Sequence, residues 1–202
     1  QISLRKREEK NISVKGLADA GKSRTEIQEA TGDVLGVHDC TVDINEGEIL
    51  VLMGLSGSGK STLLRAVNRL NPISRGKLTV HCGDETFDVG ACDESQLKQL
   101  RMDTVSMVFQ QFGLLPWRSV ADNVGFGLEI AGVAKSERDA RVTEQLALVG
   151  LSDWADRMVA ELSGGMQQRV GLARAFATGA PILLMDEPFS ALDPLIRSRL
   201  QD

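Results

Sequence analysis

The sequence has little of what secreted, membrane-spanning or disulfide-stabilised proteins need. It contains three cysteines, Cys40, Cys82 and Cys92, and no C-x-x-C pair, so we expect reduced thiols in a cytoplasmic protein. No uncharged apolar run approaches the ~18 residues of a membrane span. We expect no signal peptide, because the charged residues 5–10 are followed by no apolar run.

Aromatic residues and positive charge are also scarce. Tyrosine is absent, and no phenylalanine or tryptophan precedes Phe87. The net charge of −5 argues against a broad nucleic-acid-binding surface. With 202 residues, of which 42% are hydrophobic, the chain is predicted to be soluble and globular, with a sizeable core.

One stretch carries a specific chemical pattern. Residues 54–62 read G-L-S-G-S-G-K-S-T and fit G-x-x-x-x-G-K-[ST], the pattern of a phosphate-binding loop. The apolar residues 49–53 before it predict a buried strand, and residues 61–70 after it predict a helix. We expect Lys60 to reach the β- and γ-phosphates and the Ser61 hydroxyl to bind Mg²⁺. The alternative is a flexible turn rich in glycine and serine.

The residues before this loop predict a polar extension and one strand. Ser23 and Glu26 have the spacing of a capping box, which opens a short helix that Gly32 ends. Residues 1–22 are interpreted mainly as a charged, solvated tail. In residues 40–44 apolar and polar side chains alternate, which predicts a half-buried strand.

The residues after the loop predict a hairpin and a helix. Residues 78–80 and 87–89 are short strand candidates, and Gly83 between them is typical of a hairpin turn. Asp93 is predicted to cap a helix that runs to Arg101.

A second buried strand is predicted at residues 105–109, with Gln110 at its carboxyl end. In open α/β sheets that end of a strand faces the ligand. Gln110 therefore contacts a metal or an attacking water, or lies in a surface turn. Within the helical stretch that follows, Ser136 is predicted to cap a helix that Gly150 stops, and Trp154 is expected in the core.

Two further segments suggest a phosphate site. Ser163 can cap a helix at 166–177, while Gly164 and Gly165 leave its N–H groups open to an anion, although Ser-Gly-Gly is also common in plain turns. Residues 182–187 are four apolar residues followed by Asp186 and Glu187. Asp186 suits a Mg²⁺ role through water and Glu187 a general-base role, the alternative being a solvent-facing acidic turn.

These segments together resemble the nucleotide-binding subunits of ABC transporters. In that family's terms, residues 54–62 are Walker A, Gln110 is the Q-loop and residues 162–166 are the signature. Residues 182–187 are Walker B, and residues 190–193 are the D-loop. The resemblance covers about residues 34–202. Residues 16–21, 26–32, 53–61, 108–110 and 191–197 are similar to the importers of quaternary amines, which carry glycine betaine, proline betaine, choline or proline.

The resemblance implies a fold and a domain organisation. The fold is α/β, a P-loop NTPase (RecA-like) core with a small antiparallel β subdomain and an inserted helical subdomain. The expected boundaries are an N-terminal extension at 1–33 and a partial ATPase domain at 34–202, with the helical subdomain at 113–165. The C-terminal part of the core is expected to be missing.

The resemblance also implies a set of site residues. The catalytic residues are Glu187, Gln110 and Lys60, and the Mg²⁺ ligands are Ser61, Gln110 and Asp186. The residues that bind ATP are Gly54, Leu55, Ser56, Gly57, Ser58, Gly59, Lys60, Ser61, Thr62, Gln110, Ser163, Gly164, Gly165 and Asp186.

The resemblance further implies partners and a location. Two copies pair head to tail, so that each ATP lies between Walker A of one copy and the signature of the other. The partners are this second ATPase subunit, two membrane-spanning permease subunits and, indirectly, a substrate-binding protein, with no nucleic acid. The subunit is peripheral, at the cytoplasmic face of the inner membrane. Trp117 and Arg118 are candidates for coupling to the permeases, with packing in the core as the alternative for Trp117.

Two parts of the family pattern are absent. The switch histidine follows the D-loop in the family, whereas His38 and His81 both precede Walker B. The aromatic residue that stacks on adenine is also missing before residue 87. We therefore expect weakened ATP binding and little hydrolysis from these 202 residues. The alternatives are a soluble, non-transport ABC ATPase and a hydrolysis-deficient, truncated nucleotide-binding module.

Overall fold

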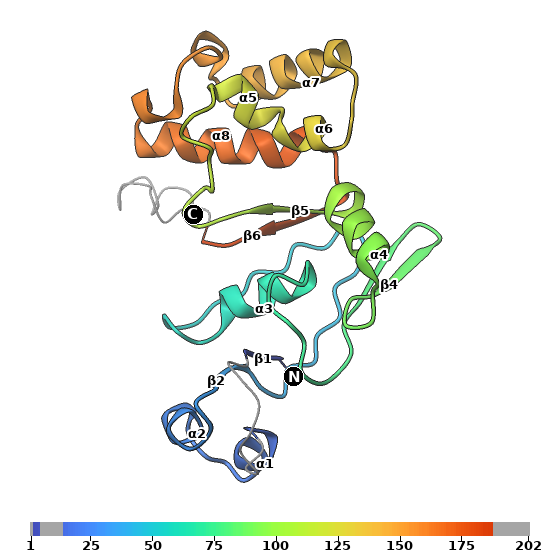
Figure 1. Cartoon of the computed structure of the whole chain (residues 1–202), viewed down its shortest axis with the longest axis vertical. Helices are drawn as coiled ribbons and strands as arrows, with labels where there is room; N and C mark the ends of the chain where they lie inside the picture. The colour runs from blue at the N-terminus through green and yellow to red at the C-terminus, as the bar shows by residue number, and fades with distance from the viewer. Residues whose placement is uncertain (1, 5–13, 188–202) are drawn as a thin grey trace. The chain divides into compact units, whose positions relative to one another are not determined.

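The computed structural model describes residues 2–4 and 14–187, which divide into two compact units, Gln1–Leu97 and Lys98–Asp202 (Figure 1). The boundary between the units falls inside one helix, α4 (Glu94–Gln99). Each unit has its own elements and its own buried side chains.

The first unit begins with two strands and two helices. β1 (Ile2–Leu4) pairs antiparallel with β2 (Val34–Val37). α1 (Val14–Asp19) and α2 (Arg24–Thr31) lie between them in the sequence. The interpretation of this region as a solvated tail is wrong for α1, because Val14 is buried.

A small apolar cluster holds these elements together. Val14 of α1, Ile27 of α2 and Leu35 of β2 are buried against one another. The capping box at the start of α2 is confirmed, because Ser23 Oγ accepts from the Glu26 N–H at 3.3 Å and Glu26 Oε2 accepts from the Ser23 N–H at 2.8 Å. The hydrogen bond from the Ser23 backbone, together with Lys22, lowers the pKa of Glu26 to about 2.

The two strands predicted before the phosphate-binding loop are wrong. Residues 40–44 and 49–53 have no strand assignment, and Ile49, Val51 and Met53 are 90%, 69% and 88% exposed. A strand is stabilised by backbone hydrogen bonds to a neighbouring strand. Within the part of the chain that the structure describes, neither segment has such a neighbour, and apolar composition alone does not supply one.

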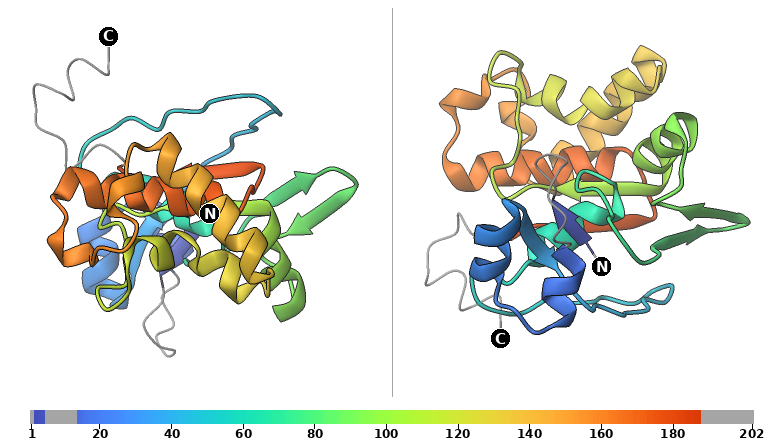
Figure 2. Two further views of the ribbon diagram at one scale, coloured as in Figure 1. Left: turned by 90° about the horizontal axis from the view of Figure 1, so that it is seen from above. Right: turned by 60° about the horizontal axis from the view of Figure 1, so that its bottom comes forward.

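The predicted hairpin is confirmed. β3 (Thr79–Cys82) and β4 (Glu85–Asp88) pair antiparallel, and Figure 2 shows them as adjacent arrows. Gly83 at the turn has a φ of 57°, which favours glycine. Val80 lies opposite Phe87, and both side chains are buried.

The helices that flank these strands lie close to the positions predicted from the sequence. α3 (Lys60–Val67) follows the phosphate-binding loop and is shorter than the predicted 61–70. Asp93 caps α4 as predicted, with Oδ1 accepting from the Gln96 N–H at 2.8 Å. A single π-helical turn, η1 (Leu100–Thr104), continues from α4 into the second unit.

The second unit contains a parallel pair of strands, both predicted. β5 (Val105–Val108) pairs with β6 (Ile182–Met185) in a register that places Val105 opposite Ile182 and Val108 opposite Met185. Because the two strands run in the same direction, their carboxyl ends meet at one edge.

Helices connect these two strands and pack on one another (Figure 1). They are α5 (Val120–Val124), α6 (Phe126–Ile130), α7 (Lys135–Leu148), η2 (Ser152–Trp154), η3 (Val159–Glu161) and α8 (Gly164–Ala177). Their apolar sides meet in a core of Val120, Val124, Leu128, Val142, Leu146, Leu151, Leu162, Val170, Ala173 and Ala177. Among the described residues no helix is both long enough and apolar enough to cross a bilayer.

Two local predictions in this region are wrong. Helix α7 begins at Lys135, so Ser136 lies inside its first turn and does not cap it. Trp154 is 36% exposed and stands outside the buried core, because η2 turns it toward the surface. The predicted stop at Gly150 fits the structure, since its φ of 67° ends the helical path.

Candidate functional site

The phosphate-binding loop has a backbone that depends on glycine. Gly54, Gly57 and Gly59 have φ angles of 154°, 77° and 102°, all in the region that side chains disfavour. The Ser58 N–H donates to the Leu55 carbonyl at 3.2 Å and closes the turn. The loop therefore curls tightly into the start of α3.

The loop lies closely against β2. A Cβ atom built on Gly59 would be 2.5 Å from the Gly36 carbonyl oxygen and 3.2 Å from Val37 Cγ2. A Cβ atom built on Gly36 would be 2.5 Å from Thr62 Cγ2. A side chain at Gly59 would displace the backbone of β2, and a side chain at Gly36 would displace the Thr62 side chain.

The start of α3 suits an anion. Gly59 is the N-cap residue and has no side chain that could cap the helix, so a phosphate oxygen can take that role. Lys60 Nζ donates to the carbonyls of Gly54 at 2.9 Å and Leu55 at 3.0 Å, which holds its charge over the loop. Backbone N–H groups, an ammonium and the Ser61 hydroxyl are the donor set for a phosphate with Mg²⁺.

In the second unit, the parallel register brings two predicted residues together. Gln110 and Glu187 each lie two residues beyond the paired ends of β5 and β6. Gln110 Nε2 donates to Glu187 Oε2 at 2.6 Å, across 77 positions of sequence. With the amide nitrogen bound to Glu187, the amide oxygen of Gln110 is the atom that suits a metal.

The two acidic residues after β6 have different environments. Asp186 is 1% exposed, and its N–H donates to the Val108 carbonyl at 2.9 Å, which extends the strand pairing by one residue. Glu187 is exposed and has a φ of 48°, an uncommon backbone for a non-glycine residue. Such strain clusters at functional sites, where the surrounding structure holds it in place. Oxygen donors from Asp186 and Gln110 fit Mg²⁺ chemically.

A half-buried arginine that the sequence did not single out fixes the segment after Gln110. Phe112 and Gly113 have φ angles of 56° and 55°. Arg174 of α8 donates to their carbonyls, through Nη2 to Phe112 at 2.6 Å and through Nη1 to Gly113 at 2.7 Å. Burial lowers the pKa of Arg174. An arginine that binds backbone carbonyls leaves no pattern in the sequence that could have identified it.

The predicted cap of α8 is confirmed. Ser163 Oγ accepts from the Met166 N–H at 3.4 Å, although the helix begins at Gly164, earlier than predicted. Cβ atoms built on Gly164 and Gly165 would meet nothing within 4 Å, so the first turn of α8 faces open space within this structure. An anion can therefore approach the first N–H groups of α8.

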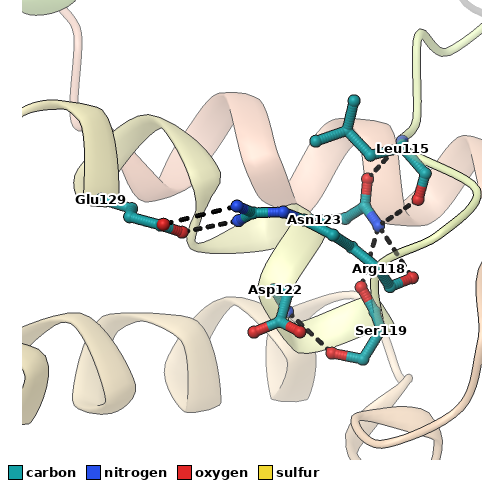
Figure 3. A network of polar contacts seen from close by, with 6 residues as sticks. All are labelled: Leu115, Arg118, Ser119, Asp122, Asn123 and Glu129. Carbon is teal, nitrogen blue, oxygen red and sulfur yellow. Dashed lines mark hydrogen bonds and ion pairs between the residues drawn. The ribbon is translucent and has the colours of Figure 1, made fainter.

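A buried asparagine orders the loop that contains Trp117 and Arg118 (Figure 3). Asn123 is fully buried, and its Oδ1 accepts from the Leu115 N–H at 2.7 Å. Its Nδ2 donates to the carbonyls of Leu115 at 3.0 Å, Arg118 at 3.3 Å and Ser119 at 2.8 Å. One side chain thus ties both ends of this loop to α5.

The two coupling candidates on this loop differ. Arg118 donates to Glu129 at 2.6 Å and lies 5.0 Å from the ring centroid of Phe126, as Figure 3 shows in part. The hydrogen bond between them raises the pKa of Arg118 and lowers the pKa of Glu129. Trp117 is 71% exposed, so within this structure it is a surface side chain on an ordered loop.

The predicted residues fall into two sets. Residues 54–62 lie in the first unit, whereas Gln110, the Ser163 segment, Asp186 and Glu187 lie in the second. Residues 190–193 and Pro194 lie outside the described residues.

Comparisons with known proteins match this sequence closely. A family model described as ABC transporter matches residues 37–190. The chain is 50% identical over 186 residues to the glycine betaine/carnitine transport ATP-binding protein GbuA of Listeria monocytogenes. The aligned residues cover 92% of this chain and 46% of GbuA. It is 49% identical over 184 residues to the glycine betaine/proline betaine transport system ATP-binding protein ProV of Salmonella typhimurium, covering 91% of this chain and 45% of ProV. The chain therefore spans about half the length of these curated relatives.

Solved structures give the same assignment of the fold. A dimeric ATP-binding cassette in a post-hydrolysis state, bound to ADP and Pi, superposes with a TM-score of 0.68 at 36% sequence identity. The match covers 79% of this chain and 68% of that cassette. The predicted fold, an α/β P-loop NTPase core, is confirmed.

The close contact between Gly59 and β2 generates a prediction. Alanine at Gly57 meets no atom within 4 Å and adds only backbone strain of about 1–2 kcal/mol. Alanine at Gly59 meets the Gly36 carbonyl as well, so we expect Gly59→Ala to weaken ADP binding at least ~10-fold more than Gly57→Ala. Titration calorimetry of both variants measures this difference, and equal losses would contradict the packing argument.

The Asn123 network generates a second prediction. Asn123→Ala leaves one buried N–H and three carbonyl groups without this partner, so we expect the free energy of unfolding to fall by about 2–4 kcal/mol. Ser119→Ala, in the same loop, removes one exposed cap bond to the Asp122 N–H and should cost only about 1 kcal/mol. Urea unfolding of the two variants tests the ranking. The reverse order would show that the loop does not depend on Asn123.

Proposed function

The chain belongs to the ABC transporter family, and on that premise we propose that it is the ATP-binding and ATP-hydrolysing part of an importer of quaternary amines. The observation that carries the proposal is the Gln110–Glu187 pair at the carboxyl ends of β5 and β6, directly after the buried Asp186. An amide oxygen and two carboxylates on one edge of a parallel pair are the groups that phosphoryl transfer to water needs.

In the proposed mechanism, the loop at 54–62 and Lys60 bind the phosphates of ATP. Ser61, Gln110 and Asp186 would hold Mg²⁺, and the ion would supply positive charge to the phosphate oxygens. Glu187 accepts a proton from the attacking water, whose oxygen forms a bond to the γ-phosphorus. The bond between the γ-phosphorus and the bridging oxygen breaks, and ADP leaves with that oxygen. The Gln110 hydrogen bond at 2.6 Å supports this role, because it holds the Glu187 carboxylate in one orientation.

We further propose that two copies share the nucleotide. Ser163, Gly164 and Gly165 of one copy would bind the phosphate held by residues 54–62 of the other. The open approach to the first turn of α8 supports this arrangement, as does the dimeric state of the similar cassette. Because each half-site would supply only part of the donors around the phosphate, ATP would strengthen the dimer.

The substrate class and the membrane partners are part of the same proposal. Support for quaternary amines comes from GbuA and ProV, whose names specify glycine betaine with carnitine or proline betaine. Trp117 is the proposed contact for a permease subunit at the cytoplasmic face of the membrane, because it is 71% exposed on a loop that Asn123 fixes.

The proposal predicts separate losses of chemistry and binding. In the complete subunit, assembled with its permeases, Glu187→Gln should lower ATP turnover by about 10²–10⁴-fold because it removes the general base, while Mg·ATP affinity stays within about twofold. Uptake of radiolabelled glycine betaine should fall in parallel with turnover.

Glu144→Gln is the matched control, since Glu144 is an exposed residue of α7. It should keep both turnover and uptake. Full turnover in Glu187→Gln would refute the assignment of the general base. Turnover with no response to glycine betaine would refute the substrate class.

A further inference from the structure

Arg24 lies outside every nucleotide-binding motif of the sequence, yet its guanidinium contacts the phosphate-binding loop. It is the first residue of α2. Its Nη1 donates to the Gly57 carbonyl, and its Nη2 donates to the carbonyls of Ser58 at 3.0 Å and Gly36 at 3.1 Å. One side chain thus joins the N-terminal extension, β2 and the loop. Arg24 and Gly57 are 33 positions apart in sequence.

The local structure of α2 does not explain an arginine at this position. A positive charge in the first turn of a helix is unfavourable, because that end of the helix dipole is also positive. The nearest acid on the helix, Glu26, is already bound by the Ser23 N–H at 2.8 Å and by Lys22 Nζ at 2.9 Å. A residue that conflicts with its local element indicates a tertiary or functional role.

Two of the three contacts, those with the carbonyls of Gly57 and Ser58, act on the backbone of the phosphate-binding loop. In a planar trans peptide the carbonyl and the N–H point in opposite directions. The Gly57 carbonyl belongs to the same peptide as the Ser58 N–H, which donates to the Leu55 carbonyl and closes the turn. The Ser58 carbonyl belongs to the same peptide as the Gly59 N–H, which lies at the start of α3. A guanidinium that fixes both carbonyls on one side therefore fixes the orientation of both N–H groups on the other.

The part of α2 that carries Arg24 is packed into a buried apolar cluster. Ile27, one turn along α2, is fully buried against Val14 and Leu35. Leu35 and Gly36 are adjacent in β2, and Gly36 is itself in close contact with Gly59 and Thr62. The guanidinium and one of its acceptors therefore belong to the same packed cluster, and the loop carbonyls are held relative to it.

We propose that Arg24 is a positioning residue for the phosphate-binding loop, and that through it the helices α1 and α2 are coupled to bound nucleotide. The inference rests on the proposed function, since it requires that this loop binds nucleotide phosphates. Phosphate on the N–H side and Arg24 on the carbonyl side stabilise the same peptide orientation. Because coupling is reciprocal, nucleotide should stabilise α2 as much as Arg24 stabilises nucleotide.

Titration of the purified chain with ADP tests the first half of this proposal. Arg24→Met keeps the length of the side chain but removes all donors, and we expect it to weaken ADP binding about 5–10-fold, since exposed charge-assisted hydrogen bonds are individually modest. Arg24→Lys should recover less than half of this loss on a logarithmic scale, because an ammonium lacks the planar fork. Lys22→Met removes the same charge two residues earlier, where Lys22 contacts Glu26, and should bind ADP like the wild type.

Hydrogen exchange tests the second half and does not depend on activity. In the wild type, ADP should slow the exchange of amides in residues 24–36, and in Arg24→Met this protection should disappear. The melting temperature of Arg24→Met without nucleotide should stay within a few degrees of the wild type, because the cluster around Ile27 is intact.

Each outcome has a separate meaning. A wild type that binds no ADP refutes the proposed function itself. A wild type that binds ADP, with equal affinity in Arg24→Met, refutes only the positioning role. Wild-type affinity in Arg24→Lys, or an equal loss in Lys22→Met, would mean that charge alone acts. If Arg24→Met does not fold, the absence of ADP protection at residues 24–36 in the wild type still overturns the coupling.

Discussion

The structure depends on side chains that satisfy backbone carbonyl groups in irregular segments. A loop that is neither helix nor strand has no regular partners for these groups, and each one left buried and unpaired is unfavourable. Arg24 supplies donors to the phosphate-binding loop, Arg174 to the turn after Gln110, and Asn123 to the loop before α5. The candidate functional loops are ordered because a side chain on a helix donates hydrogen bonds to the backbone carbonyls of each loop.

The parallel register of β5 and β6 determines which chemical groups meet. Gln110 and Glu187 are neighbours only because both strands end at the same edge, and a shift by one residue would replace Glu187 with the buried Asp186. The strain at Glu187, with its φ of 48°, is tolerated where the Asp186 N–H continues the strand pairing. Secondary structure thus sets the positions of the acidic groups, and the turn that follows sets their directions.

The sequence predicted those features that depend on short-range rules. The capping box at Ser23, the hairpin at Gly83 and the position of Gln110 at the carboxyl end of β5 follow from spacing and from local sequence patterns. The strand predicted at 49–53 is absent from the structure, since an apolar run does not specify a partner strand. Arg24, Arg174 and Asn123 bind carbonyls of distant residues, and such contacts leave no periodic pattern in the chain.

The separation of Gln110 and Glu187 has a consequence for the order in which the protein forms. The two residues are 77 positions apart, and all of α5 to α8 lies between them. During synthesis Gln110 therefore leaves the ribosome well before its partner exists, and the closure of so long a loop adds to the entropy that must be offset. The pair that we assign to hydrolysis can form only after the helices between its members have been made, so a partly synthesised chain cannot hydrolyse ATP by this route.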